Sequence, residues 1–452
     1  GLSPTLGEMA HDRGAELLRT VDNGIASFDG VARARALGME VVVTDHHLAP
    51  PVLPDATAIV NPNQPGCPFP SKNMAGVGVM FSTMLAVRKQ LREENWFQAL
   101  YDPNLSLLLD LVAIGTIADV VKLDNNNRIL VQAGLERMRS GPLRPGLKAL
   151  FEVAKIDPAY LMASDVAFKL APRINAAGRL EHMSAGIECL ISEDLDMARS
   201  MALSLDDLNR ARKEIQADMQ DDANALMIDV PKDVVGLALF EPMWREGVVG
   251  LVAGRIKEAH YKPVVAFAKA HEEGLLKGSA RSIPGIHIRD VLANVQALNP
   301  GLILKMGGHA MAAGLTIPES RLADFQHAFD SACRAASDPD MLEHVVETDG
   351  PLSPRDLTLA LARSSEAGGP WAQGFRLPLF GVRFLVKRAF TMGKDKEHVR
   401  YNVTDGVNEI SAVHFGGAEQ IRTGGHIDLV FQPTINRWQG REDVQLLVEH
   451  AE

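Results

Sequence analysis

The chain has few cysteines, no long apolar run and no excess of basic residues, and each shortage excludes a class of protein. Its three cysteines, Cys67, Cys189 and Cys333, are odd in number, far apart and without a CxxC pair. This spacing argues against a disulfide framework and against a zinc site built from thiolates. Because such a composition fits a reducing compartment, we expect the protein to be cytoplasmic.

Apolar residues make up 46% of the 452 residues, yet no apolar run approaches the ~20 residues of a membrane-spanning helix. The first residues also lack the basic and apolar segments of a secretory leader. The formal net charge is -11, which does not fit a protein that coats nucleic acid through its overall field. A nucleic-acid substrate would therefore need a local basic groove.

The pattern of apolar residues changes along the chain, and this predicts an α/β protein of about two to four domains. Strand-like and helix-like segments alternate from residue 1 to about residue 62, which predicts a parallel sheet. Residues 193–228 are charged, with apolar positions at helical spacing, and predict one long connecting helix. A second, smaller α/β unit follows from about residue 234. Short strand-like segments after about residue 343 predict a small β-barrel, for which the OB-fold is a candidate.

Acidic and imidazole side chains follow two strands of the predicted parallel sheet. Asp45, His46 and His47 come directly after one apolar run, and Asp22 follows the preceding run. In an open α/β sheet, ligands bind outside the carboxyl ends of the strands. Carboxylate and imidazole groups are ligand types suited to Mn²⁺, Zn²⁺ or Fe. Each residue alone is better explained as a cap, a turn or a surface residue, but their repeated placement favours a metal site.

A later apolar segment, residues 105–121, predicts a helix that contains Asp110 and ends near Asp119. At ~100° per residue, these two carboxylates lie on opposite sides of a continuous helix. At most one of them can therefore be a ligand, and Asp119 has the greater freedom to reach the sheet. Either carboxylate is equally well explained as a capping or solvated acid.

Three further segments are candidates for binding phosphate. Residues 170–180 combine small residues with Arg173, Asn175 and Arg179 in a predicted loop between helices. Guanidinium groups on a backbone free of bulky side chains suit a phosphate oxygen, although a plain surface turn explains this segment equally well.

The other two candidates bring hydroxyl, basic and glycine residues together in tight turns. They contain Ser279, Arg281 and His287 in the first case, and Gly307, Gly308 and His309 in the second. The glycine pair lets backbone N–H groups approach an anion before a small-residue helix or strand. A glycine pair alone often serves only a turn, but beside a second basic loop phosphate binding is the better explanation.

Taken together, these motifs resemble the DHH phosphoesterase family, and within it the single-strand-specific exonucleases. The matching stretches are residues 20–24, 43–47, 75–79, 115–120, 171–179, 278–282 and 307–314. The closing segment, with Gly-Pro-Trp-Ala-Gln-Gly at residues 369–374, is similar to the family's OB-fold. The resemblance implies a parallel-sheet DHH domain, a long connecting helix, a smaller α/β DHH-associated domain and a C-terminal OB-fold β-barrel.

The resemblance also implies roles for the candidate residues. The implied ligands of Mn²⁺ or Mg²⁺ are Asp22, His46, His47 and Asp119, with Asp45 among or beside the direct ligands. Bound ions would activate a water that attacks the phosphodiester. The residues implied to hold the terminal phosphate and the backbone are Arg173, Arg179, Ser279 and Arg281. Those implied to line the same cleft are His287, Gly308 and His309.

The activity implied by the resemblance is stepwise hydrolysis of single-stranded DNA from its 5′ end, releasing 5′-mononucleotides in recombination and mismatch repair. The implied partners are the single-strand DNA-binding protein and a helicase, and we expect a monomer. Two other interpretations stay open. One is a DHH phosphoesterase that acts on short oligonucleotides, against which the C-terminal barrel argues. The other is a non-catalytic single-strand DNA-binding module, against which the intact candidate ligands argue.

One departure from the family concerns the start of the chain. Family members carry an earlier Asp-x-Asp-x-Asp-Gly motif on the first strand of the DHH domain, and nothing like it precedes Gly1. We therefore expect a DHH domain that is incomplete at its N-terminus and lacks part of its ligand set. The predicted domains are residues 1–192 (DHH), 193–229 (connecting helix), 230–338 (DHH-associated) and 339–452 (OB-fold).

Overall fold

The computed structural model describes residues 1–98, 101–227, 231, 233–393, 396–418 and 421–452. These residues form two compact units. The first unit contains residues 1–119 and 133–344, and the second contains residues 120–132 and 345–452. The domain boundaries expected from the sequence stay predictions, and the one between residues 229 and 230 lies outside the described residues.

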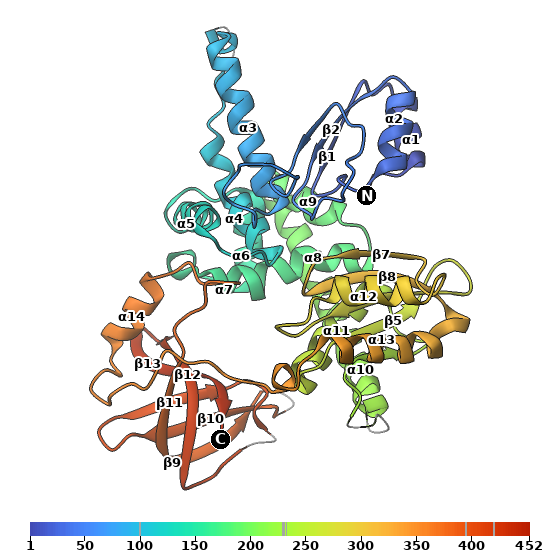
Figure 1. Ribbon diagram of the computed structural model, residues 1–452. Coiled ribbons are helices and arrows are strands. Elements are labelled where there is room, and N and C mark those ends of the chain that lie inside the picture. The colour runs from blue at the N-terminus through green and yellow to red at the C-terminus, as the bar shows by residue number, and fades with distance from the viewer. Residues whose placement is uncertain (99–100, 228–230, 232, 394–395, 419–420) are drawn as a thin grey trace. The chain divides into compact units, whose positions relative to one another are not determined.

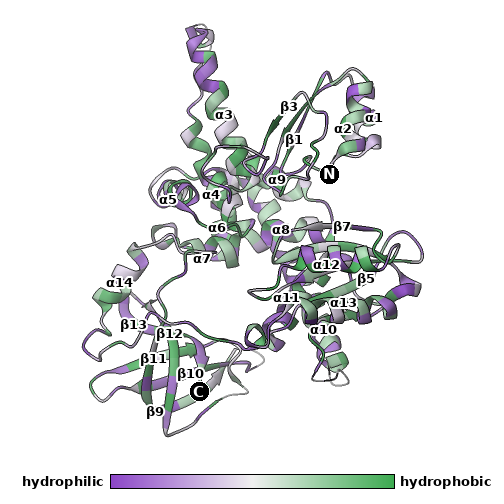
Figure 2. Cartoon of the chain, viewed as in Figure 1, coloured by the Kyte–Doolittle hydropathy of each residue, from purple (hydrophilic) through white to green (hydrophobic). Residues whose placement is uncertain are grey.

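The first unit begins with a parallel sheet in the order β1-β2-β3 (Figure 1). Its strands are β1 (Leu17–Val21), β2 (Glu40–Thr44) and β3 (Ala58–Val60), and two helices, α1 (Pro4–Asp12) and α2 (Phe28–Ala36), pack against each other beside it. The apolar core here includes Val31, Ala34, Val41 and Val43. Figure 2 colours the strands around this core as hydrophobic. The expected parallel sheet is confirmed.

A helical region follows the sheet. Its helices are α3 (Gly76–Glu93), α4 (Leu109–Ala118), α5 (Asn125–Ser140), α6 (Pro145–Ala154), α7 (Ala163–Asp165), α8 (Ala171–Leu180), α9 (Ser184–Ile191) and α10 (Leu195–Met227). The last of these runs through 33 residues without a break. Among the described residues, no helix combines the length and the apolar character needed to cross a membrane.

The prediction of a loop at residues 170–180 is wrong. Residues 171–180 form helix α8, which directly follows a π-helical turn, Val166–Leu170. Pro172 lies in the first turn of the helix, where its missing N–H breaks no hydrogen bond. The small residues are alanines that favour a helix, and Ala176 and Ala177 are fully buried. The candidate basic residues of this segment therefore project from a rigid helix.

The second part of the first unit is a five-stranded mixed sheet in the order β4-β5-β6-β8-β7. Its elements are β4 (Leu237–Phe240), α11 (Glu246–His260), β5 (Val264–Lys269), β6 (Leu275–Arg281), α12 (Ile288–Leu298), β7 (Lys305–Gly308), β8 (Ala312–Pro318) and α13 (Leu322–Ala336). Separate apolar clusters cover the two faces of this sheet, one containing Phe267 and Phe325 and the other Val252 and Ala266. The segment after the glycine pair is thus a strand rather than a helix.

The second unit is a β-barrel, as the sequence predicts. Its strands, β9 (Phe380–Met392), β10 (His398–Thr404), β11 (Glu409–His414), β12 (His426–Trp438) and β13 (Arg441–Ala451), close in the order β10-β11-β13-β12-β9. Helix α14 (Leu359–Ala367) packs on β12 and β13. The barrel core includes Phe384, Tyr401 and Phe431.

We predict that the small parallel sheet depends on the buried valines of β2. Val43 is fully buried, so Val43→Ala removes two methyl groups from the core and should lower the free energy of unfolding by about 2 kcal/mol. Val52→Ala makes the same chemical change at a side chain that is 72% exposed and should have almost no effect. Urea unfolding followed by circular dichroism measures both variants. Equal destabilisation by the two variants would contradict this account of the core.

Candidate active site

The pairing of β1 and β2 brings their carboxyl ends to the same edge of the sheet. Val21 pairs with Thr44 in the last register position, and the backbone N–H of Asp22 then donates to the carbonyl of Thr44 at 3.0 Å. The backbone N–H of Asp45 donates in turn to the carbonyl of Val60 on β3 at 3.1 Å. The side chains that follow the strands therefore emerge next to one another.

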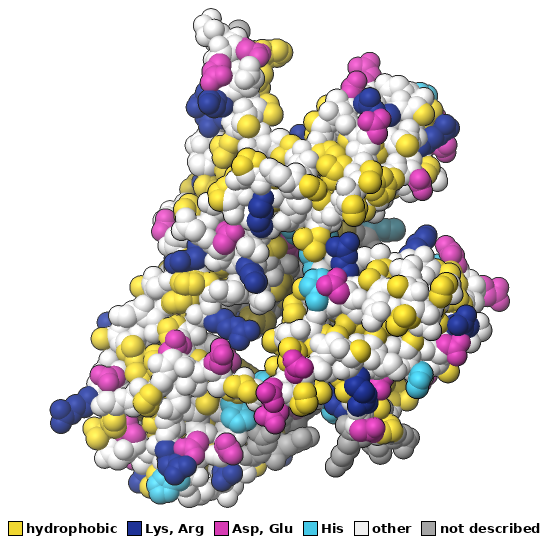
Figure 3. All heavy atoms as spheres, in the orientation of Figure 1, with side chains coloured by type: hydrophobic (Ala, Val, Ile, Leu, Met, Phe, Trp, Pro, Cys, Tyr) yellow, Lys and Arg dark blue, Asp and Glu magenta, His cyan; other side chains and the backbone are white. Residues whose placement is uncertain are grey.

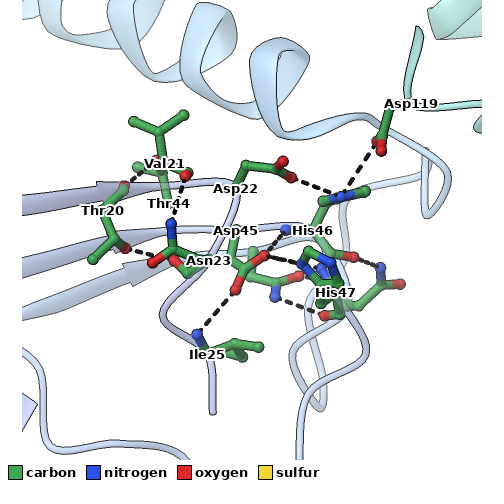
Figure 4. Close-up of polar contacts among 12 residues, drawn as sticks. Thr20, Val21, Asp22, Asn23, Ile25, Thr44, Asp45, His46, His47 and Asp119 are labelled. Carbon is green, nitrogen blue, oxygen red and sulfur yellow. Dashed lines mark hydrogen bonds and ion pairs between the residues drawn. The ribbon is translucent and has the colours of Figure 1, made fainter. Parts of the chain in front are cut away.

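The Asp45 carboxylate organises this edge (Figure 4). Its side chain is 1% exposed, and Oδ2 accepts a hydrogen bond from the backbone of Ile25 at 2.9 Å. Oδ1 accepts from the backbone of His46 at 2.7 Å and from the backbone and ring Nδ1 of His47 at 3.1 and 2.7 Å. Burial raises the pKa of Asp45, but the hydrogen bonds from His47 and Ile25 outweigh burial and lower the pKa to about 2.

The hydrogen bond to Asp45 also sets the chemistry of His47. It raises the pKa of His47, with burial acting in the opposite direction and the charges of Asp45, Asp22 and Asp119 adding to the rise. With Nδ1–H donating to the carboxylate, the free lone pair is on Nε2, which is the usual arrangement of a metal-binding histidine. The structure thus places Asp45 as the group that orients His47, with both of its own oxygens already hydrogen-bonded.

His46 is the centre of the candidate ligand cluster. Its buried Nε2 lies 2.9 Å from Asp22 Oδ1 and 3.4 Å from Asp119 Oδ2, yet makes no hydrogen bond. One ligand atom each from Asp22, His46 and His47 lies within 4.8 Å of the others. Burial raises the pKa of Asp119, and the charge of Asp22 adds to the rise despite the opposing effect of His46. Carboxylates and imidazoles that converge without bonding to one another fit a divalent cation such as Mn²⁺.

Asp119 and Asp110 separate as the helical geometry predicts. Asp119 is the C-cap of α4 and reaches His46. Asp110, in the first turn, is 2% exposed and forms an ion pair with Arg144 at 2.9 Å. Only Asp119 of the pair therefore lies at the cluster.

Gly76 is a site residue that sequence reasoning missed. It begins α3, and a Cβ at this position would lie 2.5 Å from Asp22 Oδ1. Asp22 itself has φ 63°, a left-handed conformation uncommon for a residue with a side chain. The one available signal was the Gly-x-Gly at residues 76–78, which lies within a stretch, residues 75–79, that matches the family.

A second cluster gathers Arg179, Ser279 and Arg281 around the start of α11. Arg179 Nη1 donates to the carbonyl of Gly247 at 3.0 Å, and Arg281 Nη1 donates to Ser279 Oγ at 3.0 Å. A Cβ on Gly250 would lie 2.8 Å from Ser279 Oγ and 2.9 Å from Arg281 Nη2. Burial lowers the pKa of both arginines, and the charge of Arg179 lowers that of Arg281 further. Among the described residues, neither arginine forms an ion pair with a carboxylate.

Two candidates from α8 behave differently from Arg179. Arg173 is held by Asp206 on α10, with Nε and Oδ1 2.9 Å apart, and by the carbonyl of Lys169. Its charge is therefore already neutralised. Asn175 lies half-buried on the same helix. Sequence reasoning missed the two glycines that make room for the arginine cluster, Gly247 and Gly250, which lie three residues apart near one face of α11.

The Gly-Gly-His segment reaches the candidate ligand cluster. Gly307 and Gly308 end β7, and Gly308 has φ 147°, which favours glycine. The ring of His309, in the following turn, lies 5.0 Å from that of His47 and 6.0 Å from that of His46 between centroids. Burial, with smaller contributions from the charges of His47 and His46, lowers the pKa of His309.

His287 has a capping role in the structure. It is the N-cap of α12, and its Nδ1 accepts from the backbone of Asp290 at 3.3 Å.

In the barrel unit, Trp438 is 69% exposed, whereas the neighbouring Arg437 is held by Glu366 and Glu442.

The chain is similar to known proteins along most of its length. Three family models match: "DHH family, N-terminal domain" at residues 3–116, "DHHA1 domain" at residues 233–335 and "RecJ OB domain" at residues 348–450. The relatives named single-stranded-DNA-specific exonuclease RecJ include that of Dickeya dadantii, 46% identical over 100% of this chain and 80% of its own length. The Escherichia coli protein of that name is 45% identical over 100% of this chain and 79% of its own length.

Two solved structures similar to this chain are of proteins bound to manganese. RecJ from Thermus thermophilus in complex with Mn²⁺ matches with a TM-score of 0.81 and 27% identity, covering 99% of this chain. This chain spans 63% of the length of that one. Another structure, of exonuclease RecJ bound to manganese, matches 75% of this chain and 80% of its own with a TM-score of 0.58 and 31% identity.

The parallel sheet, the Asp–His–His edge and the DHHA1 match define a protein of the DHH phosphoesterase class. Two relatives named RecJ are 45–46% identical to this chain over all of its length, which identifies the family within this class. The chain belongs to the RecJ family.

We predict that metal binding depends on pH through His47. A proton on His47 competes with the cation, and the raised pKa places the midpoint above the ordinary histidine value of about 6.5, so affinity falls as the pH is lowered through that midpoint. Asp45→Asn removes the carboxylate that raises this pKa and should shift the midpoint to lower pH. Isothermal titration with Mn²⁺ across this range measures both proteins. An unchanged or higher midpoint in the variant would contradict the assigned pairing.

We also predict that Gly76→Ala weakens metal binding, because the new Cβ must displace the Asp22 carboxylate. A loss of about tenfold or more in Mn²⁺ affinity is expected for a disturbed ligand. Gly254→Ala is the matched control, since nothing lies within 4 Å of a Cβ at that helical position. Titration calorimetry with unchanged circular dichroism separates the local effect from unfolding. Equal affinities for the two variants would refute this role of Gly76.

Proposed function

We propose that the protein is a metal-dependent exonuclease that hydrolyses single-stranded DNA from its 5′ end to 5′-mononucleotides. The observation that carries this proposal is the presence, within one compact unit, of both a carboxylate–imidazole cluster and an arginine–serine anion site. His309 comes from the same mixed sheet as Ser279 and Arg281, and its ring lies beside that of His47. The names of the close relatives support the same activity.

The proposed ligands of Mn²⁺ or Mg²⁺ are Asp22, His46, His47 and Asp119. Bound there, a divalent cation supplies an activated water and neutralises charge on the phosphodiester in the transition state. Asp45 keeps His47 in the tautomer that exposes Nε2. Arg281 and Arg179 bind phosphate oxygens, with Ser279 fixing the Arg281 guanidinium through its hydroxyl.

The charge distribution supports local rather than global binding of the strand. Figure 3 shows acidic and basic side chains interspersed over the visible face, in keeping with the net charge of -11. The substrate must then be held mainly by the partly buried cluster of Arg179 and Arg281. The barrel supplies a further platform, with the exposed Trp438 available for stacking on a base.

The cellular setting of this activity is also part of the proposal. By family resemblance, the enzyme would act in the cytoplasm as a monomer, during recombination and mismatch repair. A helicase would expose the strand and the single-strand DNA-binding protein would deliver it.

We predict metal-dependent release of 5′-mononucleotides from a 5′-phosphorylated single strand. Release is expected with Mn²⁺, absent with EDTA and absent from a blunt duplex. His46→Gln should reduce the rate by at least about 100-fold, because it removes the central ligand of the cluster. Asp29→Asn, which changes an exposed acid on α2, should leave the rate unchanged.

The same assay separates the competing functions. Faster hydrolysis of a dinucleotide than of a long strand would indicate a phosphoesterase for short oligonucleotides. Retained binding of the long strand without any release, with Mn²⁺ bound, would indicate a non-catalytic binding module. Either result would overturn the proposed exonuclease activity of this chain.

A further inference from the structure

Three side chains of helix α10, Asn209, Arg212 and Gln220, each have one buried polar atom without a hydrogen-bond partner among the described residues. Asn209 is 2% exposed and Arg212 is 8% exposed. Asn209 Oδ1 and Arg212 Nε are buried without hydrogen-bond partners, and no ion pair involves Arg212 within the described residues. A buried polar atom without a partner is unfavourable, so the two that lie one turn apart on Asn209 and Arg212 require an explanation.

The surroundings of Arg212 are those of the arginine cluster. Helix α10 packs against both α8, which carries Arg179, and α11, which carries Gly247. After burial, the charge of Arg179 is what lowers the pKa of Arg212, and it does the same to Arg281. The positive charge of Arg179 therefore acts on two other guanidinium groups, Arg212 and Arg281, which lie on elements next to α8 or in the adjoining mixed sheet.

The arginines without carboxylate partners contrast with a nearby ion pair between α8 and α10. Arg173 on α8 is matched by Asp206 on α10, so the interface between these helices neutralises a charge where no ligand is needed. The guanidiniums of Arg179, Arg212 and Arg281 have no such carboxylate among the residues described. Charges buried without partners are unfavourable unless an anion joins them.

We propose that Arg212 belongs to the same anion site as Arg179, Ser279 and Arg281, and that it reads the terminal phosphate of the strand. The inference rests on the proposed function, which supplies single-stranded DNA as the substrate. A terminal phosphate monoester carries about 1.5 to 2 negative charges near neutral pH, whereas an internal phosphodiester carries about one. A third guanidinium therefore favours a phosphorylated 5′ end over a hydroxyl end.

Asn209 is the positioning residue for this arginine. It precedes Arg212 by three residues, so both side chains lie on one side of α10. The unused atom of Asn209 is an acceptor and that of Arg212 is a donor, so a rotation of the arginine side chain can pair them. Such pairing would turn the outer guanidinium nitrogens toward a bound phosphate.

The test compares binding of two single strands of one sequence, with a 5′-phosphate or a 5′-hydroxyl, by fluorescence anisotropy in EDTA. Arg212→Met should weaken binding of the phosphorylated strand by about tenfold, the effect of one lost charge-assisted contact, and leave the hydroxyl strand unchanged. Arg212→Lys should give an intermediate loss. Lys213→Met removes the same charge from an exposed neighbour on α10 and should change neither affinity.

Asn209→Asp provides an independent variant that keeps Arg212 in place. A carboxylate one turn away neutralises the arginine, so the preference for the phosphorylated strand should fall while the chain remains folded. A purely structural role for Arg212 would weaken binding of both strands equally or leave the preference intact in both variants, and either result overturns the proposal. Because binding is measured without metal, loss of the preference can be distinguished from a failure of the hydrolysis itself.

Discussion

The hydrogen bonds accepted by the Asp45 carboxylate hold together the edge of the sheet that carries the candidate metal ligands. Four N–H groups converge on this one buried side chain, three of them from His46 and His47. The fourth, from Ile25, ties the chain that follows β1 to the end of β2. The two histidines are therefore held in position by Asp45, while the backbone of Asp22 is held by the carbonyl of Thr44. Without this carboxylate the two strands would still end at the same edge of the sheet, but the side chains that follow them would not be held in a fixed orientation.

Two halves of one unit build the rest of the site. The parallel sheet provides the carboxylates and imidazoles, while the mixed sheet provides His309, Ser279 and Arg281. Arg179 links the halves, because it projects from α8 and donates to Gly247 on α11. Close approach of these elements requires glycine, since a Cβ on Gly247 would lie 2.2 Å from the carbonyl oxygen of Arg179. The anion site thus depends on backbone contact as well as on charge.

The local part of this arrangement could be predicted from sequence. The apolar runs that end at Asp22 and Asp45 define strands by themselves, and parallel strands end at one edge. The separation of Asp110 from Asp119 follows from helical periodicity alone. By contrast, the helix at residues 171–180 was hidden by its proline and glycine, whose positions inside a helix look like those of a loop.

The rest of the candidate site depends on contacts between residues that are distant in the sequence. Arg173 and Arg179 are equally good candidates for phosphate binding when only the sequence is considered. In the structure, Asp206, 33 residues after Arg173, neutralises Arg173 and not Arg179. Arg212 looks like one more charge on a solvated helix until the packing of α10 shows that it is buried. The contact between Gly76 and Asp22 likewise joins segments that only the folded sheet brings together. Sequence patterns locate candidate side chains, whereas the choice among them depends on which counter-charges the fold brings near.

Backbone strain marks the two carboxylates that converge on His46. Asp22 has φ 63°, and Val120, directly after Asp119, has φ 58° although it is β-branched. Such conformations cost about 1–3 kcal/mol each and persist only where the surrounding structure enforces them. Helix α4 must end at Asp119 for that carboxylate to turn toward the sheet, and β1 must end at Asp22 for the same reason. The fold therefore gives up stability to bring two negative charges to one imidazole, an arrangement that a bound divalent cation would stabilise.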